Sequence, residues 1–142
     1  MQHLHDMWSS PDNSRLTSKQ FSFRLPVHLA AKLAALSEIY PQKNRTQIVA
    51  DLLSAALDDL EKNLPHKFME APEYVQQNQA EAARDLGFDF DTVYELAGSR
   101  GNFRALSNKY YREYEKELGN DSPVKLYEDI YGSKEFLESA LK

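Results

Sequence analysis

The sequence predicts a mostly α-helical protein with one short strand near its N-terminus. Residues 19–25 alternate polar and apolar side chains, which is the period-two pattern of a half-buried strand. Residues 27–39 and 44–64 then carry apolar residues at spacings of three and four, which is typical of amphipathic helices. Beyond Pro65, proline and glycine divide the chain into further segments with helical patterns.

Length and composition suit a globular protein of one domain or two small ones. The chain has 142 residues, of which 42% are hydrophobic and 27% charged, and it contains no cysteine. Disulfides, thiolate metal sites and cysteine nucleophiles are therefore excluded, and we expect a cytoplasmic location. No apolar run reaches the roughly 20 residues of a membrane span. Residues 1–18 are polar and are expected to form a flexible arm rather than a signal peptide.

Two helices are expected directly after the strand. Pro26 ends the strand and opens the first helix, because its missing N–H is not needed in a first turn. The apolar stripe of this helix consists of Leu29, Leu33 and Leu36. Pro41 stops it, and Asn44 caps the second helix, with Gln47 completing a capping-box pattern. The apolar face of the second helix consists of Ile48, Leu52, Leu53, Ala56, Leu57 and Leu60.

The second half of the chain is predicted to be helical throughout. Residues 65–71 are expected to be a linker, and residues 72–142 a small all-α C-terminal domain. The helices expected there run from Pro72 to Gly87, from Asp89 or Asp91 to Gly98, from Asn102 to Gly119, from Ser122-Pro123 to Gly132, and from a cap at Ser133 onward.

A single strand leaves its backbone hydrogen-bonding groups without partners, and a second copy of the chain would supply them. Here the sequence resembles the ribbon-helix-helix family of DNA-binding proteins, of the Arc and MetJ type. The stretches that carry the resemblance are Gln20-Phe21-Ser22-Phe23-Arg24-Leu25-Pro26 and Asn44-Arg45-Thr46-Gln47-Ile48-Val49, together with the leucine stripe between them. The resemblance covers residues 19–62, with a longer turn at residues 40–43 than the family often has.

The resemblance implies a homodimer in which two strands form a ribbon that enters the DNA major groove. It implies base contacts from Gln20, Ser22 and Arg24. Arginine can bond two guanine acceptors, and glutamine can bond adenine. It implies phosphate contacts at the start of the second helix, from Lys43, Asn44, Arg45 and Thr46, where free N–H groups and the helix dipole favour an anion. It implies a dimer core of Phe21, Phe23, Leu25, Leu33, Leu36, Ile48 and Leu52.

Charge is unevenly distributed along the chain. Residues 15–48 contain six basic residues and one acidic residue, although the whole chain has a net charge of −5. Such a local basic patch suits nucleic acid better than the total charge suggests. Residues 65–142 contain 15 acidic and 10 basic residues and are rich in tyrosine. We expect them to face away from DNA, with Tyr111 and Tyr127 as candidate anchors for a protein partner.

Together with the basic patch, the resemblance implies a dimeric, sequence-specific transcriptional regulator, expected to be a repressor, whose partner is double-stranded DNA. One alternative is an antitoxin-type autorepressor whose C-terminal domain binds a protein. Another is an interaction protein that uses the ribbon only to dimerise. No enzyme is expected, because a Ser-His-acid set, a P-loop and a dinucleotide fingerprint are missing. No cofactor is expected, and His3, His5 and Asp6 are not expected to hold a metal.

Overall fold

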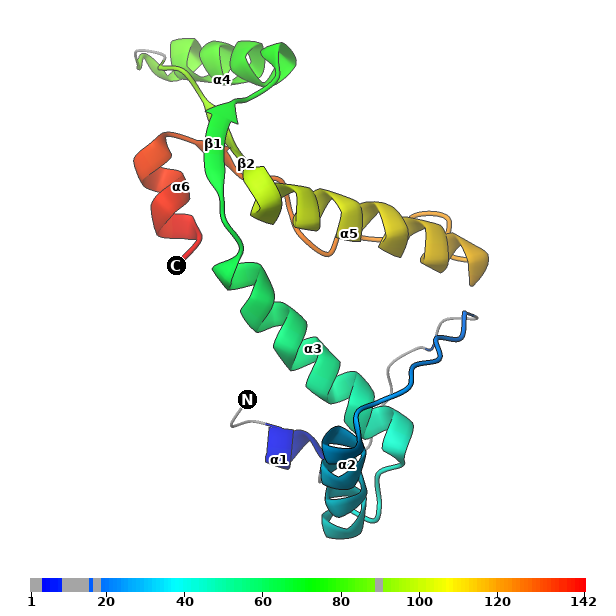
Figure 1. Ribbon diagram of the computed structural model, residues 1–142. Coiled ribbons are helices and arrows are strands. Elements are labelled where there is room, and N and C mark those ends of the chain that lie inside the picture. Colours follow the sequence, from blue (N-terminus) through cyan, green and yellow to red (C-terminus); the bar gives the residue numbers. More distant parts are fainter. Residues whose placement is uncertain (1–3, 9–15, 17–18, 89–90) are drawn as a thin grey trace. The chain divides into compact units, whose positions relative to one another are not determined.

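The computed structural model describes residues 4–8, 16, 19–88 and 91–142 (Figure 1). These residues form a mostly helical protein with a small antiparallel sheet. The chain divides into two compact units, Met1–Leu60 and Glu61–Lys142. The expected helix cap at Asp89 lies outside the described residues, as do Arg15 and His3.

Unit 1 contains α1 (Leu4–Trp8), α2 (Val27–Ile39) and most of α3 (Arg45–Asn63). Its core forms around Ile48, which is completely buried. The residues packed around it are Leu4, Trp8, Ala55, Leu33, Leu36, Tyr40 and Leu52. The Trp8 indole Nε1 donates a hydrogen bond of 2.7 Å to the Asp51 carboxylate. Residues 4–8 are therefore a packed helix, which corrects the expectation of a flexible arm for that part of residues 1–18. The sequence signal was weak because only Leu4, Met7 and Trp8 are apolar there.

The helices of unit 1 begin and end at the residues that the sequence predicts. α2 begins directly after Pro26 and ends before Pro41. At the start of α3 the capping box is confirmed: the Gln47 N–H donates to Asn44 Oδ1 at 2.8 Å, and the Asn44 N–H donates to Gln47 Oε1 at 3.3 Å. Both polar side chains therefore satisfy backbone donors that the helix itself leaves open.

Residues 19–26 do not form a strand within the single chain (Figure 1). The backbone of residues 20–25 makes no hydrogen bond to any other residue that the structure describes. A strand needs a neighbouring strand, and the sheet of this protein lies entirely in unit 2.

Unit 2 is built on a three-stranded antiparallel sheet in the order β1-β2-β3. The strands are β1 (Lys67–Glu70), β2 (Tyr94–Ala97) and β3 (Tyr131–Gly132). This sheet corrects two predictions: residues 65–71 contain β1 instead of a simple linker, and the C-terminal domain is not all-α. The strands are at most four residues long and pair across long separations, with Lys67 opposite Ala97. Such pairs leave no periodic signal in the sequence.

Three helices accompany this sheet: α4 (Glu73–Leu86), α5 (Gly98–Glu117) and α6 (Lys134–Ala140). α4 starts after Pro72 and stops at Gly87 as predicted, and Ser133 caps α6 by accepting from the Phe136 N–H at 3.1 Å. β2 replaces the short helix expected before Gly98, and α5 begins at Gly98 rather than Asn102. No helix forms at residues 122–132, where a non-helical segment leads into β3.

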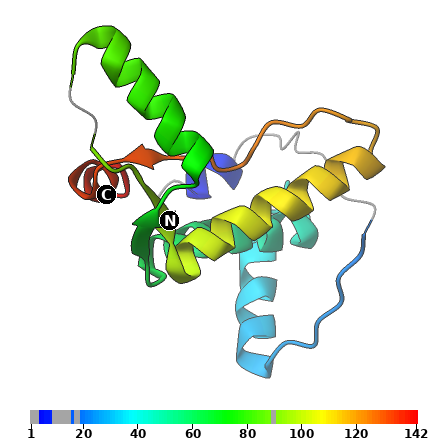
Figure 2. The ribbon, with the colours of Figure 1, turned by 90° about the horizontal axis from the view of Figure 1, so that it is seen from above.

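α5 and α6 pack against β2, whereas α4 lies at the end of the sheet, away from both (Figures 1 and 2). Gln76 fixes α4 there, because its side chain bonds both the N–H and the carbonyl of Val93, at 2.8 and 2.6 Å. Gly98 joins β2 to α5 with φ +76°, and a Cβ at this position would lie 3.2 Å from the backbone of His66 and Lys67. A larger residue would be strained there and would press β1 away.

Candidate nucleic-acid interface

The predicted base-reading residues are accessible in the structure. Gln20, Ser22 and Arg24 are all exposed. The apolar side chains that alternate with them are exposed as well: 64% of Phe21, 75% of Phe23 and 47% of Leu25. Both faces of this segment are therefore open to solvent in the single chain. The polar face is available to a ligand, while the apolar face lacks the cover that phenylalanine side chains usually have.

The start of α3 presents the features of an anion site. Arg45 and Thr46 are exposed, and their backbone N–H groups make no hydrogen bond to the described part of the chain. The Asn44 side chain is occupied by the capping box. The two open N–H groups, the positive end of the helix dipole and the Arg45 guanidinium together favour a phosphate.

Lys43 differs from its neighbours in this predicted phosphate-binding set. Only 7% of its surface is exposed, and its backbone N–H donates to the Tyr40 carbonyl at 3.1 Å. Its side chain is thus part of the turn between α2 and α3 rather than of the exposed helix end.

The predicted dimer core divides into two groups in the structure. Leu33, Leu36, Ile48 and Leu52 already pack within the chain against α1. Phe21, Phe23 and Leu25 remain exposed. Sequence reasoning missed α1 as the cover of the first group, because a five-residue helix has too few apolar positions to show a pattern.

α3 carries a second apolar stripe that the structure leaves open. It consists of Leu53, Leu57 and Leu60, each about half exposed. At 100° per residue this stripe lies about 140° around the helix from the buried stripe formed by Ile48, Leu52 and Ala55. One face of α3 is therefore packed within the chain, and the opposite face is available for a partner.

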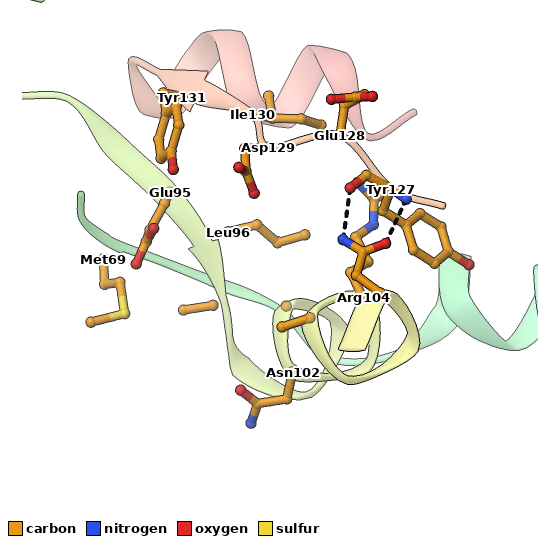
Figure 3. A pocket seen from close by; sticks show the side chains of 14 residues that line it. Met69, Glu95, Leu96, Asn102, Arg104, Tyr127, Glu128, Asp129, Ile130 and Tyr131 are labelled. Carbon is orange, nitrogen blue, oxygen red and sulfur yellow. Dashed lines mark hydrogen bonds between the residues drawn. The ribbon is translucent and has the colours of Figure 1, made fainter. Parts of the chain in front are cut away.

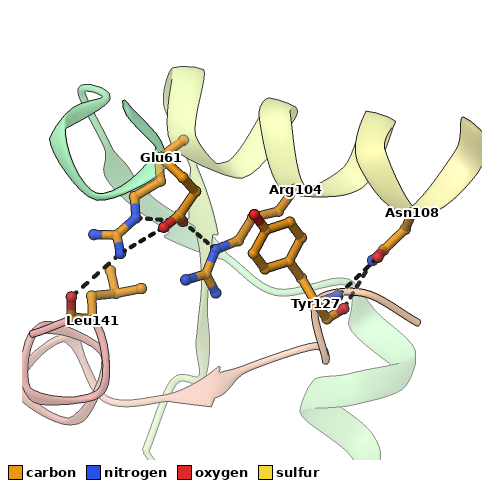
Figure 4. A network of polar contacts seen from close by, with 6 residues as sticks. Glu61, Arg104, Asn108, Tyr127 and Leu141 are labelled. Carbon is orange, nitrogen blue, oxygen red and sulfur yellow. Dashed lines mark hydrogen bonds and ion pairs between the residues drawn. The ribbon is translucent and has the colours of Figure 1, made fainter. Parts of the chain in front are cut away.

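Unit 2 contains a buried ion cluster that the sequence did not indicate. Glu61 accepts from Arg100 Nε at 2.7 Å and from Arg104 Nε at 2.6 Å, and Arg100 also donates to the Leu141 carbonyl at 3.3 Å (Figure 4). Burial alone would raise the pKa of Glu61, but the hydrogen bonds and charges of the two arginines outweigh it and lower the pKa. Glu61 lies 39 and 43 positions before the two arginines, so no local sequence motif indicates the cluster.

A pocket of about 260 Å³ lies beside this cluster in unit 2 (Figure 3). Strands β1 and β2, the first half of α5 and residues 127–131 line it. Residues 127–131 are held against α5 by Asn108, whose side chain bonds the carbonyl and the N–H of Tyr127 at 2.8 and 2.9 Å. Sequence reasoning missed this pocket because β2 was expected to be helical.

Two groups at the pocket have shifted pKa values. Burial, and secondly the charge of Asp129, raise the pKa of Glu95. Burial and a hydrogen bond with Tyr74 raise the pKa of Tyr131 to about 12. At neutral pH Tyr131 is therefore a neutral hydroxyl, and Glu95 sits where negative charge is disfavoured.

The two tyrosines expected to anchor a partner are both half-buried. The Tyr127 ring packs edge-on to Phe103, and the Arg104 guanidinium lies 4.9 Å from its centre. Tyr127 is therefore part of the packing of unit 2. The more exposed apolar side chains of this unit are Leu86, Phe88 and Val124.

Comparisons of the chain with protein-family models, with curated proteins and with solved structures find no match. Among the residues that the structure describes, no helix is long and apolar enough to cross a membrane. The same residues contain no group of three histidine or acidic side chains placed to hold a metal ion. Any function must therefore be argued from the side chains themselves.

Proposed function

We propose that the chain is a homodimeric, sequence-specific DNA-binding regulator of the ribbon-helix-helix type that represses transcription. The observation that carries the proposal is the exposed alternating segment at residues 20–25, which has no strand partner among the described residues. It is followed by α2 and α3, the two helices that the resemblance implies, and α3 opens with the Asn44–Gln47 capping box.

A second copy of the chain supplies what this segment lacks. Two antiparallel copies of residues 20–25 would satisfy each other's backbone groups and place Phe21, Phe23 and Leu25 on one face of a ribbon. The open stripe of α3, Leu53, Leu57 and Leu60, offers further apolar surface to the second copy. Burying one such side chain is worth roughly 1.5–3 kcal/mol, and the two-fold axis doubles each contribution.

The opposite face of that ribbon would carry Gln20, Ser22 and Arg24 twice, once from each copy. A two-stranded ribbon fits the major groove, where Arg24 reads guanine and Gln20 reads adenine. The exposed N-terminus of α3 then holds the DNA backbone through Arg45 and the N–H groups of Arg45 and Thr46. We leave Lys43 out of this contact because it is buried.

An antitoxin-type autorepressor is the second candidate. The net negative charge of residues 65–142 favours a basic protein partner. The strongly exposed side chains of Leu86, Phe88 and Val124 offer that partner an apolar contact. An interaction protein that only dimerises through the ribbon is the third, and DNA binding separates it from the first two.

The test is selection of bound sequences from random DNA with the full chain, followed by titration of the selected site. Arg24→Ala should weaken binding to the selected site by roughly 1–3 kcal/mol per lost base contact and leave non-specific binding almost unchanged. Arg45→Ala should weaken binding to every sequence and flatten its salt dependence. Arg84→Ala is the matched control, since Arg84 is an exposed arginine on α4.

A further inference from the structure

The pocket of unit 2 exists because β3 pairs with β2 over only two residues, Tyr94 opposite Gly132 and Glu95 opposite Tyr131. Residues 127–130 then leave the strand and are tethered to Asn108 on α5. The edge of β2 at Leu96 and Ala97 therefore has no strand beside it on that side, and the space between becomes the pocket (Figure 3).

Close packing at the base of the pocket fixes its size. A Cβ at Gly101 would lie 2.7 Å from the Leu96 carbonyl oxygen, so α5 approaches β2 as closely as a glycine allows. The resulting volume of about 260 Å³ is just below the range of about 300–1,000 Å³ for drug-sized ligands. The pocket is thus suited to a small molecule.

Negative charge dominates the lining. Glu95, Glu128 and Asp129 contribute carboxylates, while Arg104 is the one cation among the described lining residues. The Arg104 guanidinium is already bonded to Glu61 and lies over the Tyr127 ring. It is therefore not available to neutralise the carboxylates across the pocket.

Glu95 is the carboxylate with the least compensation. It projects from the middle strand on the same face as Met69 and Tyr131, which are its direct neighbours across the sheet. It makes no hydrogen bond or ion pair with any residue that the structure describes, whereas Asp129 has an exposed ion pair with Lys125 at 2.6 Å. In Figure 3, Glu95, Asp129 and Tyr131 lie together on one side of the pocket, and Glu128 points away from them. The raised pKa of Glu95 is consistent with this lack of a cation.

Most of the remaining lining is apolar, although Asn102 and Asn108 contribute amide groups. The apolar part is formed by Met69, Leu96, Ala105, Ile130 and the two tyrosine rings, Tyr127 and Tyr131. A ligand that combines one positive charge with a short apolar or aromatic group would match both parts of this lining.

We propose that this pocket binds a small organic cation, a protonated amine with a short apolar substituent. Its ammonium group sits between Glu95 and Asp129 and donates to both carboxylates. Its apolar group lies against Leu96 and Ile130. This site does not depend on the proposed DNA interface, and its test gives the same answer whether or not the chain binds DNA.

The test uses the full chain and three probes of nearly the same shape: benzylammonium, benzyl alcohol and benzoate. Binding is followed by two-dimensional NMR of the nitrogen-labelled protein and by calorimetry at neutral pH. We expect benzylammonium to bind at millimolar concentration or better and to shift the amide signals of residues 95–97 and 127–131. The alcohol carries no positive charge to pair with the carboxylates and should bind at least about tenfold more weakly, and benzoate should not bind.

Two variants test whether Glu95 and Asp129 are the carboxylates that bind the ammonium group. Glu95→Gln and Asp129→Asn should each lower the affinity for benzylammonium at least about fivefold and change that for benzyl alcohol less. Glu135→Gln, at an exposed position of α6 outside the pocket, should change neither. The proposal is overturned if benzylammonium does not bind, if it and benzyl alcohol bind equally, or if the shifted signals lie elsewhere. The probe comparison on the wild-type protein decides this even where a variant fails to fold.

Discussion

Unit 1 and unit 2 differ in how far their side chains find contacts within the single chain. In unit 2 even the buried charges have partners, with Glu61 bonded to both Arg100 and Arg104. Unit 1 has a small core under α1 but leaves Phe21, Phe23 and the second stripe of α3 exposed. This difference is what our proposal of a second copy rests on: the exposed apolar side chains of unit 1 include those on residues 21–25 and on one face of α3.

Among the variants that test this comparison, we expect the largest loss of stability from a change in the ion cluster of Glu61, Arg100 and Arg104. Glu61→Ala leaves Arg100 buried without its carboxylate, and breaking such a pair typically costs about 3–5 kcal/mol. We expect the free energy of unfolding to drop accordingly in urea titrations followed by circular dichroism. Glu113→Ala is the control, because Glu113 is exposed on α5. If both variants unfold with the same free energy, the ion cluster does not stabilise unit 2 and this part of the account is wrong.

The same cluster predicts an acid limit to stability. The pKa of Glu61 is lowered in the folded state, so its stabilising contribution is present above the unfolded value near 4.5 and is lost as pH falls below it. Wild-type protein should therefore lose more stability than Glu61→Gln between pH 5 and acid pH, since glutamine does not titrate. Parallel pH curves for the two proteins would contradict the assigned ion pairs.

The exposed stripe of α3, formed by Leu53, Leu57 and Leu60, tests whether unit 1 pairs with a second copy. Leu57→Glu should weaken the dimer by roughly 3 kcal/mol or more, because one buried leucine is lost from each copy. The monomer should keep its helical circular dichroism, since Leu57 is not part of the core around Ile48. Ser54→Glu, exposed elsewhere on α3, is the control in sedimentation experiments. A dimer that tolerates Leu57→Glu would place the interface elsewhere.

The cap of α3 should give a smaller effect. Asn44→Ala removes the acceptor for the Gln47 N–H and should destabilise unit 1 by about 1 kcal/mol. Thr46→Ala, also in the first turn, should be nearly neutral. Thermal unfolding of the two variants compares them directly, and a neutral Asn44→Ala would mean that the capping box adds little.

The effect predicted for Tyr131 is confined to alkaline pH and is absent at neutral pH. Its pKa is raised to about 12, so the folded state holds a proton that an unfolded tyrosine, with a pKa near 10, releases. Stability should therefore fall as pH rises from about 10 to about 12. Tyr131→Phe should remove this part of the pH dependence in alkaline unfolding curves, whereas Tyr110→Phe, on the exposed side of α5, should not.

Local signals in the sequence predicted local structure well. Pro26, Pro41 and the Asn44–Gln47 pair set the ends of α2 and α3, and Pro72, Gly87 and Ser133 mark α4 and α6. Contacts between distant residues were not visible. β1 and β2 are four-residue strands whose pairing depends on partners about 30 positions away, and Glu61 meets its arginines across about 40.

The candidate interface shows the same limit. Alternation at residues 20–25 predicted a half-buried strand, whereas in the single chain the segment forms no strand and both of its faces are exposed. It did not reveal that Trp8 and Leu4 cover Ile48, or that Lys43 is buried in the turn. Helix propensity and spacing describe a segment alone, and tertiary contacts decide which of its faces stays open.

The central claim is that residues 20–25 become a strand only when two copies of the chain meet. The most direct measurement is NMR on a mixture of labelled and unlabelled full-length chains, which detects contacts between copies alone. We predict antiparallel backbone contacts between the two copies of residues 20–25, centred near Phe23, with slow amide exchange in this segment. A folded protein with no contact between copies and rapid exchange at residues 20–25 would contradict the ribbon, the dimer and the DNA-binding proposal built on them.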